Sequence, residues 1–166
     1  MKLAIKLTLL LLLPVALYAQ DTTVVKKQAN IVAAALIAGN YSTVINYMHP
    51  KVLKMVGGKD KLLQLMTNGM KQMKAQGITF QSATIGSPGK FYKAGTEIHC
   101  LVPENVTMKV GANTLHSQSN LLAVSSDKGK NWTFIDLNKN TIAQIPKMFP
   151  NFNKALKIPE PKQMGM

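Results

Sequence analysis

Apolar side chains recur at helical spacing in the first half of the chain. The helical period predicts helices over residues 22–38, 42–48 and 60–76. Gly39 marks the end of the first helix, and Pro50 ends the second because proline disfavours the helical conformation of the residue before it. The last of these helices presents an apolar face that consists of Leu62, Leu63, Met66, Met70 and Met73.

From residue 78 onwards, apolar and polar positions alternate, and this period is typical of strands. Strands are predicted over residues 78–85, 97–102, 114–125 and 131–137. The second strand is expected to continue past Pro103 over residues 106–110, with a bulge at the proline. Strands joined by such short turns pair antiparallel, because a parallel pair needs a long crossover. A short helix over residues 142–148 and a proline-rich tail complete the predicted elements.

Helices followed by antiparallel strands indicate an α+β domain. We expect three N-terminal helices packed on a strongly curved antiparallel sheet, which form a cone whose open end can become a pocket. Residues 20–150 make up this domain, and residues 151–166 form a C-terminal tail. A domain of roughly 150 residues is long enough to bury one stable core.

The segment over residues 1–19 has the order of a secretory signal peptide. Lys2 and Lys6 form a basic head, residues 7–13 are almost entirely apolar, and small residues lead to the end of the segment. The apolar run is shorter than the roughly 20 residues that cross a bilayer, and no later segment approaches that length. We therefore expect an exported chain, secreted or periplasmic, that starts near Gln20 and has no transmembrane segment.

Charge adds information about partners. The 20 basic side chains are all lysines, and with only seven acidic residues the formal net charge is +13. Lysine lacks the guanidinium fork that reads guanine edges, so no nucleic-acid partner is expected. The lysines are scattered, which favours a solvated basic surface; loose attraction to an acidic envelope polymer or anionic lipid is the functional alternative.

Neither a metal nor a cofactor nor an intramolecular disulfide is expected. Cys100 is the only cysteine, and it shares a strand face with Val102, which favours a small buried apolar role. The adjacent His99 points to the opposite face of the strand, so the two side chains cannot bind one metal. His49 and His116 lie far from it in the sequence and form no metal-ligand pair.

A turn motif precedes the last predicted strand. Residues 125–132 have the spacing S-x-D-x-G-x-x-W, which resembles the Asp-box turn that repeats in sialidase propellers. Asp127 can accept bonds from backbone amides, Gly129 can adopt a positive φ, and Trp132 can pack under the hairpin. A propeller needs many blades, and this chain has one copy of the motif, so a structural turn is favoured over glycan hydrolysis.

The order of elements and several short segments resemble the NTF2-like (SnoaL-like) superfamily. The segments are GNY at residues 39–41, YMHP at 47–50, GG at 57–58 and WTFID at 132–136. The resemblance implies three N-terminal helices against a curved antiparallel sheet. It implies little about function, because such cones host isomerases, dehydratases, binding modules and assembly domains. The cystatin-like fold is the nearest alternative, and three helices before the sheet disfavour it.

Asp136 is the acidic residue with the most informative position. It alternates onto the strand face of Trp132 and Phe134, so on a concave face it would lie in an aromatic-lined cone. Burial would raise its pKa and suit it to general-base chemistry, with His116 as a partner. The simpler interpretation, which we favour, is that Asp136 ends the strand and caps the following turn.

Two functions follow from these patterns. The first is an exported, non-catalytic module that binds a small apolar molecule or an envelope component, with a homodimer through the sheet as a compatible arrangement. The second is an isomerase- or dehydratase-like cone enzyme that uses Asp136 and His116. The expected ligand-binding residues are Phe80, His116, Trp132, Phe134 and Asp136. Because few acids and histidines converge, binding is favoured over catalysis.

Overall fold

The computed structural model describes residues 21–164, and the predicted signal peptide lies outside the described residues. The helices are α1 (Thr22–Ile37), α2 (Tyr41–Asn46), α3 (Pro50–Val56), α4 (Lys59–Ala75) and α5 (Lys139–Met148). The strands are β1 (Ile78–Ile85), β2 (Tyr92–Ala94), β3 (Glu97–Val110), β4 (Asn113–Ser125), β5 (Thr133–Asp136) and β6 (Lys162–Met164).

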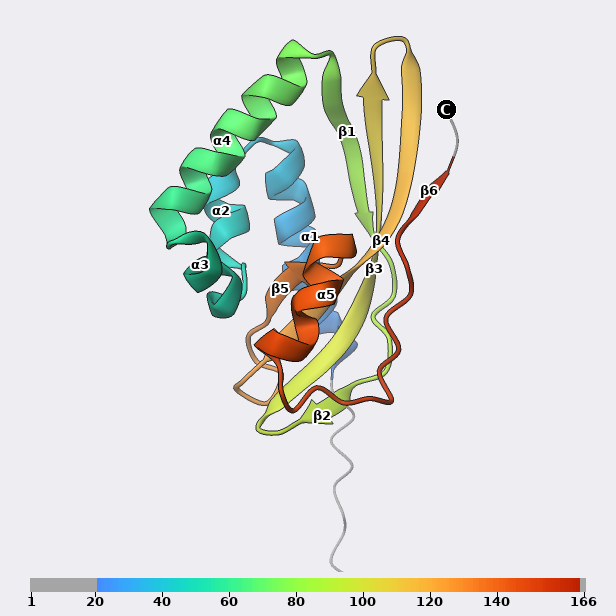
Figure 1. The fold of residues 1–166 in the computed structure, drawn as a ribbon. Helices are drawn as coiled ribbons and strands as arrows, with labels where there is room; N and C mark the ends of the chain where they lie inside the picture. The colour runs from blue at the N-terminus through green and yellow to red at the C-terminus, as the bar shows by residue number, and fades with distance from the viewer. Residues whose placement is uncertain (1–20, 165–166) are drawn as a thin grey trace, which may run out of the picture.

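The α+β prediction is confirmed. Four helices precede a strongly curved antiparallel sheet and lie on one side of it (Figure 1). The strand order is β1-β3-β4-β5, with β2 added to β3 and β6 added to β4. The helix beyond the predicted three is the short α3, whose first residue is Pro50. Proline is favoured at this position, since its fixed φ suits a helix and its missing N–H has no intrahelical acceptor there.

Each face of the sheet has its own core. On the concave face, α1 packs against the sheet through a cluster that includes Val25, Ala29, Val102, Leu121 and Phe134. On the convex face, α5 and the segment after it cover Leu122, Val124 and Ile135, among others. The segment after α5, predicted as a tail, places Leu156 in this second core and ends as β6 against β4.

The predicted bulge at Pro103 is wrong. The β3–β4 register runs without interruption from Ile98 to Val110, and Pro103 pairs directly with Asn120. The carbonyl of Pro103 points away from β4 and accepts from the Gly86 N–H at 2.8 Å. The N–H that proline lacks would point the same way, so β4 loses no hydrogen bond. The irregularity lies in β1 instead, between Phe80 and Ser82.

The Asp-box turn is confirmed as a structural hairpin. The Asp127 carboxylate accepts from the backbone and the side-chain amide of Asn131, at 2.9 and 2.7 Å, and from the Ser125 hydroxyl at 2.9 Å. The Trp132 indole N–H donates to the Gly129 carbonyl at 3.0 Å, and Gly129 has a φ of +89°. The turn therefore fixes the start of β5 relative to the end of β4.

We expect Asp127→Ala to lower the free energy of unfolding by about 1–2 kcal/mol, because three donors lose their acceptor. Gly129→Val should also destabilise, since a β-branched residue is strained at positive φ. Chemical denaturation measures both effects, with Ser126→Ala, an exposed change in the same turn, as the control. Parent-like stability of Asp127→Ala would show that these bonds do not hold the turn.

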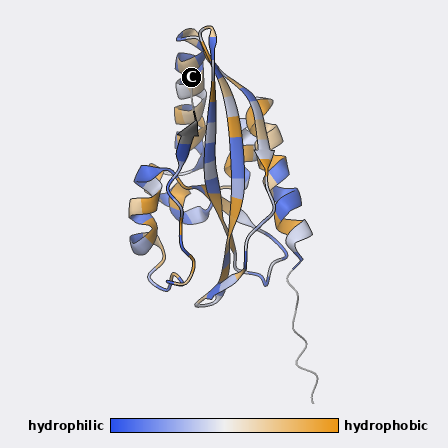
Figure 2. Cartoon of the chain, turned by 90° about the vertical axis from the view of Figure 1, so that its right-hand side faces the viewer, coloured by the Kyte–Doolittle hydropathy of each residue, from blue (hydrophilic) through white to orange (hydrophobic). Residues whose placement is uncertain are grey.

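No helix among residues 21–164 is both long enough and apolar enough to span a membrane. Hydrophilic and hydrophobic positions alternate along the long strands in Figure 2, as expected for a sheet whose two faces differ in burial.

Candidate functional site

A cavity lies between the N-terminal helices and the concave face of the sheet; we call it the cone cavity. Its volume is about 710 Å³, and it is only partly open. Most of its wall is apolar and comes from α1, α2, α4 and the strands, including Val32, Leu36, Tyr47, Met66, Phe80, Met108 and Leu121. A cavity of this size and lining suits a small organic molecule.

The strand register determines which side chains enter the cone cavity. Glu104 pairs with Ser119 on β4, and Leu121, two residues further on, pairs with Asp136 on β5. Paired residues and residues two apart share a face, so these four side chains all point to the concave side. Glu104 and Asp136 thus reach the cavity from two strands that flank β4.

Backbone hydrogen bonds join the segment after α2 to β5. The Phe134 N–H donates to the Tyr47 carbonyl at 2.8 Å, and the His49 N–H donates to the Phe134 carbonyl at 3.1 Å. The rings of Tyr47 and Phe134 are tilted, with 6.4 Å between their centroids. This pairing places both aromatic side chains in the wall of the cone cavity, next to Asp136.

Glu104 and Asp136 form an acidic pair in this apolar surrounding. Glu104 is only 8% exposed, and burial, assisted by the nearby Asp136 charge, raises its pKa to about 7. Asp136 is exposed at the end of β5, and the protein atoms around its carboxyl group still raise its pKa, although the Asn138 amide, which donates to its carboxylate at 3.1 Å, acts in the opposite direction. Near neutral pH the pair therefore holds a proton that an exposed pair would have lost.

The Glu104 carboxyl group opens on the cone cavity. Among residues 21–164, no side chain donates a hydrogen bond to it or forms an ion pair with it. A third acid, Glu160, lines the same cavity from the segment before β6, and Lys139 is the one cationic residue of the lining. The cone cavity thus combines a long apolar wall with one acidic region.

Three of the predicted site residues line the cone cavity: Phe80, Phe134 and Asp136. Asp136 is also the last residue of β5 and accepts from the N-cap residue of α5, Asn138, so both interpretations of its position describe it in part. Trp132 lies outside this lining; it is 2% exposed and packs in the concave-face core beside Phe91.

The structure does not bring His116 to Asp136. His116 pairs with Thr107, whose hydroxyl lies 3.2 Å from its Nδ1, and both alternate to the face opposite Glu104 and Ser119. The acid that faces Asp136 is Glu104, which the sequence analysis missed. The predicted bulge at Pro103 interrupted the alternation. An unbroken strand would have placed Glu104 on the face of Val102 and Val106.

Cys100 is fully buried in the concave-face core, as predicted, and burial raises the pKa of its thiol to about 12. His99 lies on the other face, where its Nε2 meets the Glu97 carboxylate at 3.2 Å. Among residues 21–164, no three histidine, cysteine or acidic side chains converge on a point that could hold a metal ion. The cone cavity offers three acids but no histidine or cysteine.

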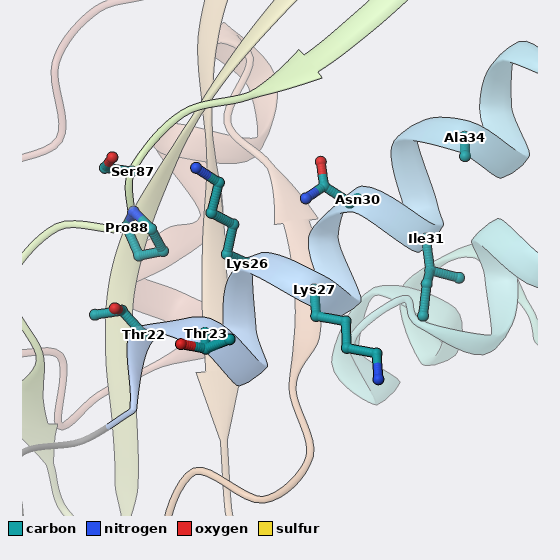
Figure 3. A pocket seen from close by; sticks show the side chains of 9 residues that line it. All are labelled: Thr22, Thr23, Lys26, Lys27, Asn30, Ile31, Ala34, Ser87 and Pro88. Atoms are coloured by element: carbon teal, nitrogen blue, oxygen red, sulfur yellow. The ribbon is translucent and has the colours of Figure 1, made fainter.

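A second depression, of about 760 Å³, lies outside the cone between the start of α1 and the loop after β1 (Figure 3). Thr22, Ser87 and Pro88 form part of its rim, and the side chains of Lys26 and Lys27 point away from each other. It is a more open groove than the cone cavity. The cone cavity is therefore the stronger candidate site.

Comparisons of the chain with protein-family models, with curated proteins and with solved structures gave no match. The lining of the cone cavity therefore carries the functional conclusion on its own.

Proposed function

We propose that this protein is an exported, NTF2-like binding module that holds a small, mainly apolar molecule in the cone cavity and releases it unchanged. The observation that carries the proposal is the cavity of about 710 Å³ between α4 and the concave sheet. Ligand sites of this kind bind by apolar burial, while a few polar groups fix the orientation. The methionines in the wall, Met66 and Met108, suit such a site because their flexible side chains adapt to irregular apolar shapes.

Catalysis is the second candidate, and one observation favours it. Glu104 is buried in the mainly apolar wall of the cone cavity, on the same sheet face as Asp136, and its raised pKa would let it donate or accept a proton near neutral pH. An isomerase- or dehydratase-like reaction would then use Glu104 with Asp136 in place of His116. Substrate turnover that Glu104→Gln abolishes while the fold is kept would establish this alternative.

Filling the cone cavity is expected to abolish binding. Ser119 faces the cavity from the middle of β4, so Ser119→Trp places a large ring where the ligand would lie. Gln118→Trp is the matched control, because Gln118 is exposed and alternates to the opposite face. The probe is decan-1-ol, an uncharged molecule with a long apolar body, and its binding is measured by isothermal titration calorimetry.

We expect the parent chain and Gln118→Trp to bind decan-1-ol with similar affinity, and Ser119→Trp to lose at least about tenfold, since the probe would lose most of its apolar contact. Native mass spectrometry of the mature chain should show any molecule that co-purifies in the cavity. Equal binding by Ser119→Trp and Gln118→Trp, with both variants folded, would place the apolar site elsewhere and refute the proposal.

A further inference from the structure

We infer that the ligand of the cone cavity carries a protonated amine, which binds between the Glu104 and Asp136 carboxylates while its apolar body lies against the methionine and aromatic walls. This inference rests on the proposed function, because it assigns the ligand class of the same cavity.

The distribution of charge points to a cation. Of the seven acidic residues in this strongly basic chain, three line the cone cavity: Glu104, Asp136 and Glu160. Twenty lysines are distributed along the sequence, but only Lys139 belongs to the lining. Glu104 is buried in the wall of this cavity, whereas Asp136 and Glu160 are exposed residues, so three of the seven acids border a partly open, mainly apolar cavity. The local potential of the cavity therefore opposes that of the rest of the surface.

The geometry of the sheet allows one small head group to reach both carboxylates. Glu104 lies on β3 and Asp136 on β5, so two strand spacings, roughly 10 Å, separate their backbones. Both side chains lie on the concave face of a strongly curved sheet (Figure 1) and line the cone cavity. The Asp136 charge adds to the effect of burial on the pKa of Glu104, which places Glu104 within electrostatic reach of Asp136. An ammonium group, with three donors, can bond to both.

The open acceptor positions of Glu104 distinguish between head groups. Its carboxyl group is largely buried, opens on the cone cavity and receives no hydrogen bond from the described residues, so a donor on a ligand in the cavity can bond to it. A hydroxyl group would supply one neutral hydrogen bond, whereas an ammonium group supplies charge-assisted bonds, which are roughly twice as strong. A carboxylate ligand would lie against two acids and be repelled. We therefore expect the cavity to bind an amine more tightly than an alcohol, and an alcohol more tightly than a fatty acid.

Protonation links the binding of an amine to pH. The titratable groups that face the site are Glu104 on β3, Asp136 on β5, Glu160 before β6, Lys139 on α5 and Tyr47 after α2. Of the two acids in the pair, Glu104 has a pKa of about 7 without ligand, so it is mostly protonated near pH 6. A cation at this position favours the ionised carboxylate and should release about one proton on binding near pH 6, and much less near pH 8.5.

The experiment compares three probes with the same apolar body: decylamine, decan-1-ol and decanoate. Their affinities are compared by isothermal titration calorimetry near pH 8.5. Decylamine is also titrated near pH 6, and at each pH two buffers of different ionisation enthalpy report proton release. The variants are Glu104→Gln and Asp136→Asn, which keep the shape of each side chain and remove its charge. Asp60→Asn is the control, because it changes the net charge equally from the first turn of α4, outside the cone cavity.

We expect decylamine to bind at least about tenfold more tightly than decan-1-ol, with decanoate the weakest. Glu104→Gln and Asp136→Asn should weaken the binding of decylamine much more than that of decan-1-ol and so remove most of the preference for the amine, whereas Asp60→Asn should leave the affinities for both probes unchanged. Equal affinities for the amine and the alcohol would overturn the amine assignment while keeping the apolar site. Failure of all three probes to bind would overturn the proposed function itself.

Discussion

Replacing Glu104 with glutamine is expected to stabilise the folded protein near pH 8 and to leave its stability almost unchanged near pH 4. Burial raises the pKa of this carboxyl from 4.5 to about 7 in the folded chain. Between these two values the folded state keeps a proton that the unfolded state has lost, so stability decreases as the pH rises. Above about pH 7 the full penalty is present, and one pKa unit corresponds to about 1.4 kcal/mol, so the penalty is about 3 kcal/mol.

Urea denaturation of the parent chain and of Glu104→Gln near pH 4 and near pH 8 measures this effect. Glutamine cannot ionise. The free energy of unfolding of Glu104→Gln, relative to that of the parent, should therefore increase by about 3 kcal/mol from pH 4 to pH 8. Asp60→Asn, which removes an exposed carboxylate, provides the charge-matched control. An advantage that does not change with pH would show that Glu104 titrates as an exposed acid, and it would remove the basis for an electrostatic site in the cone cavity.

Replacing His49 with asparagine is expected to make the protein more resistant to acid. His49 is 5% exposed, and its Nδ1 accepts from the Lys51 N–H at 3.2 Å at the start of α3. Burial lowers its pKa from 6.5 to about 4, and the positive Lys51 and the neighbouring His99 add to the effect, while Glu97 opposes it. Below pH 6.5, His49 binds a proton in the unfolded state but stays neutral in the folded state until about pH 4, so stability is lost as the pH falls.

The loss should reach about 3 kcal/mol at pH 4, by the same conversion of pKa units into free energy. Asparagine keeps an acceptor at the N-cap and does not titrate, so His49→Asn should remove this part of the acid sensitivity even where it is less stable at pH 7. The free energy of unfolding, measured at several values between pH 7 and pH 4, gives the slope. His116→Asn, at an exposed histidine, provides the matched control. A parental slope in His49→Asn would contradict the burial of a neutral ring.

Local order in the sequence was sufficient to predict most elements. The predicted strand 78–85 has the same bounds as β1, and the predicted helix over residues 60–76 differs from α4 by one residue at each end. Such segments can be predicted locally, because the spacing of apolar residues and the glycines that end an element act within a few residues. The three-residue strands β2 and β6 carry no such signal. Each exists because a neighbouring long strand, β3 or β4, offers free backbone groups.

The candidate site was predicted less completely for a physical reason. Phe80, Phe134 and Asp136 line the cone cavity as expected, because alternation within one strand places them. Trp132 shares the predicted face but is covered by Phe91 and the core, and only packing between distant segments shows this. The sheet faces on which His116 and Glu104 lie depend on the alternation of side chains along two long strands. An error of one residue at Pro103 moves Glu104 to the other face in the prediction.

The sequence by itself determined the class of fold, the turn at Asp127, the apolar role of Cys100 and the position of Asp136 at a strand end. Each depends on residues near in the chain, where periodicity, proline, glycine and side-chain chemistry act directly. The tertiary structure alone decided which face of the sheet is concave and that Glu104 and Asp136 lie on it together, in the lining of one cavity. That pairing joins β3 to β5 through β4, and the register and curvature of a sheet arise only when all its strands pack together.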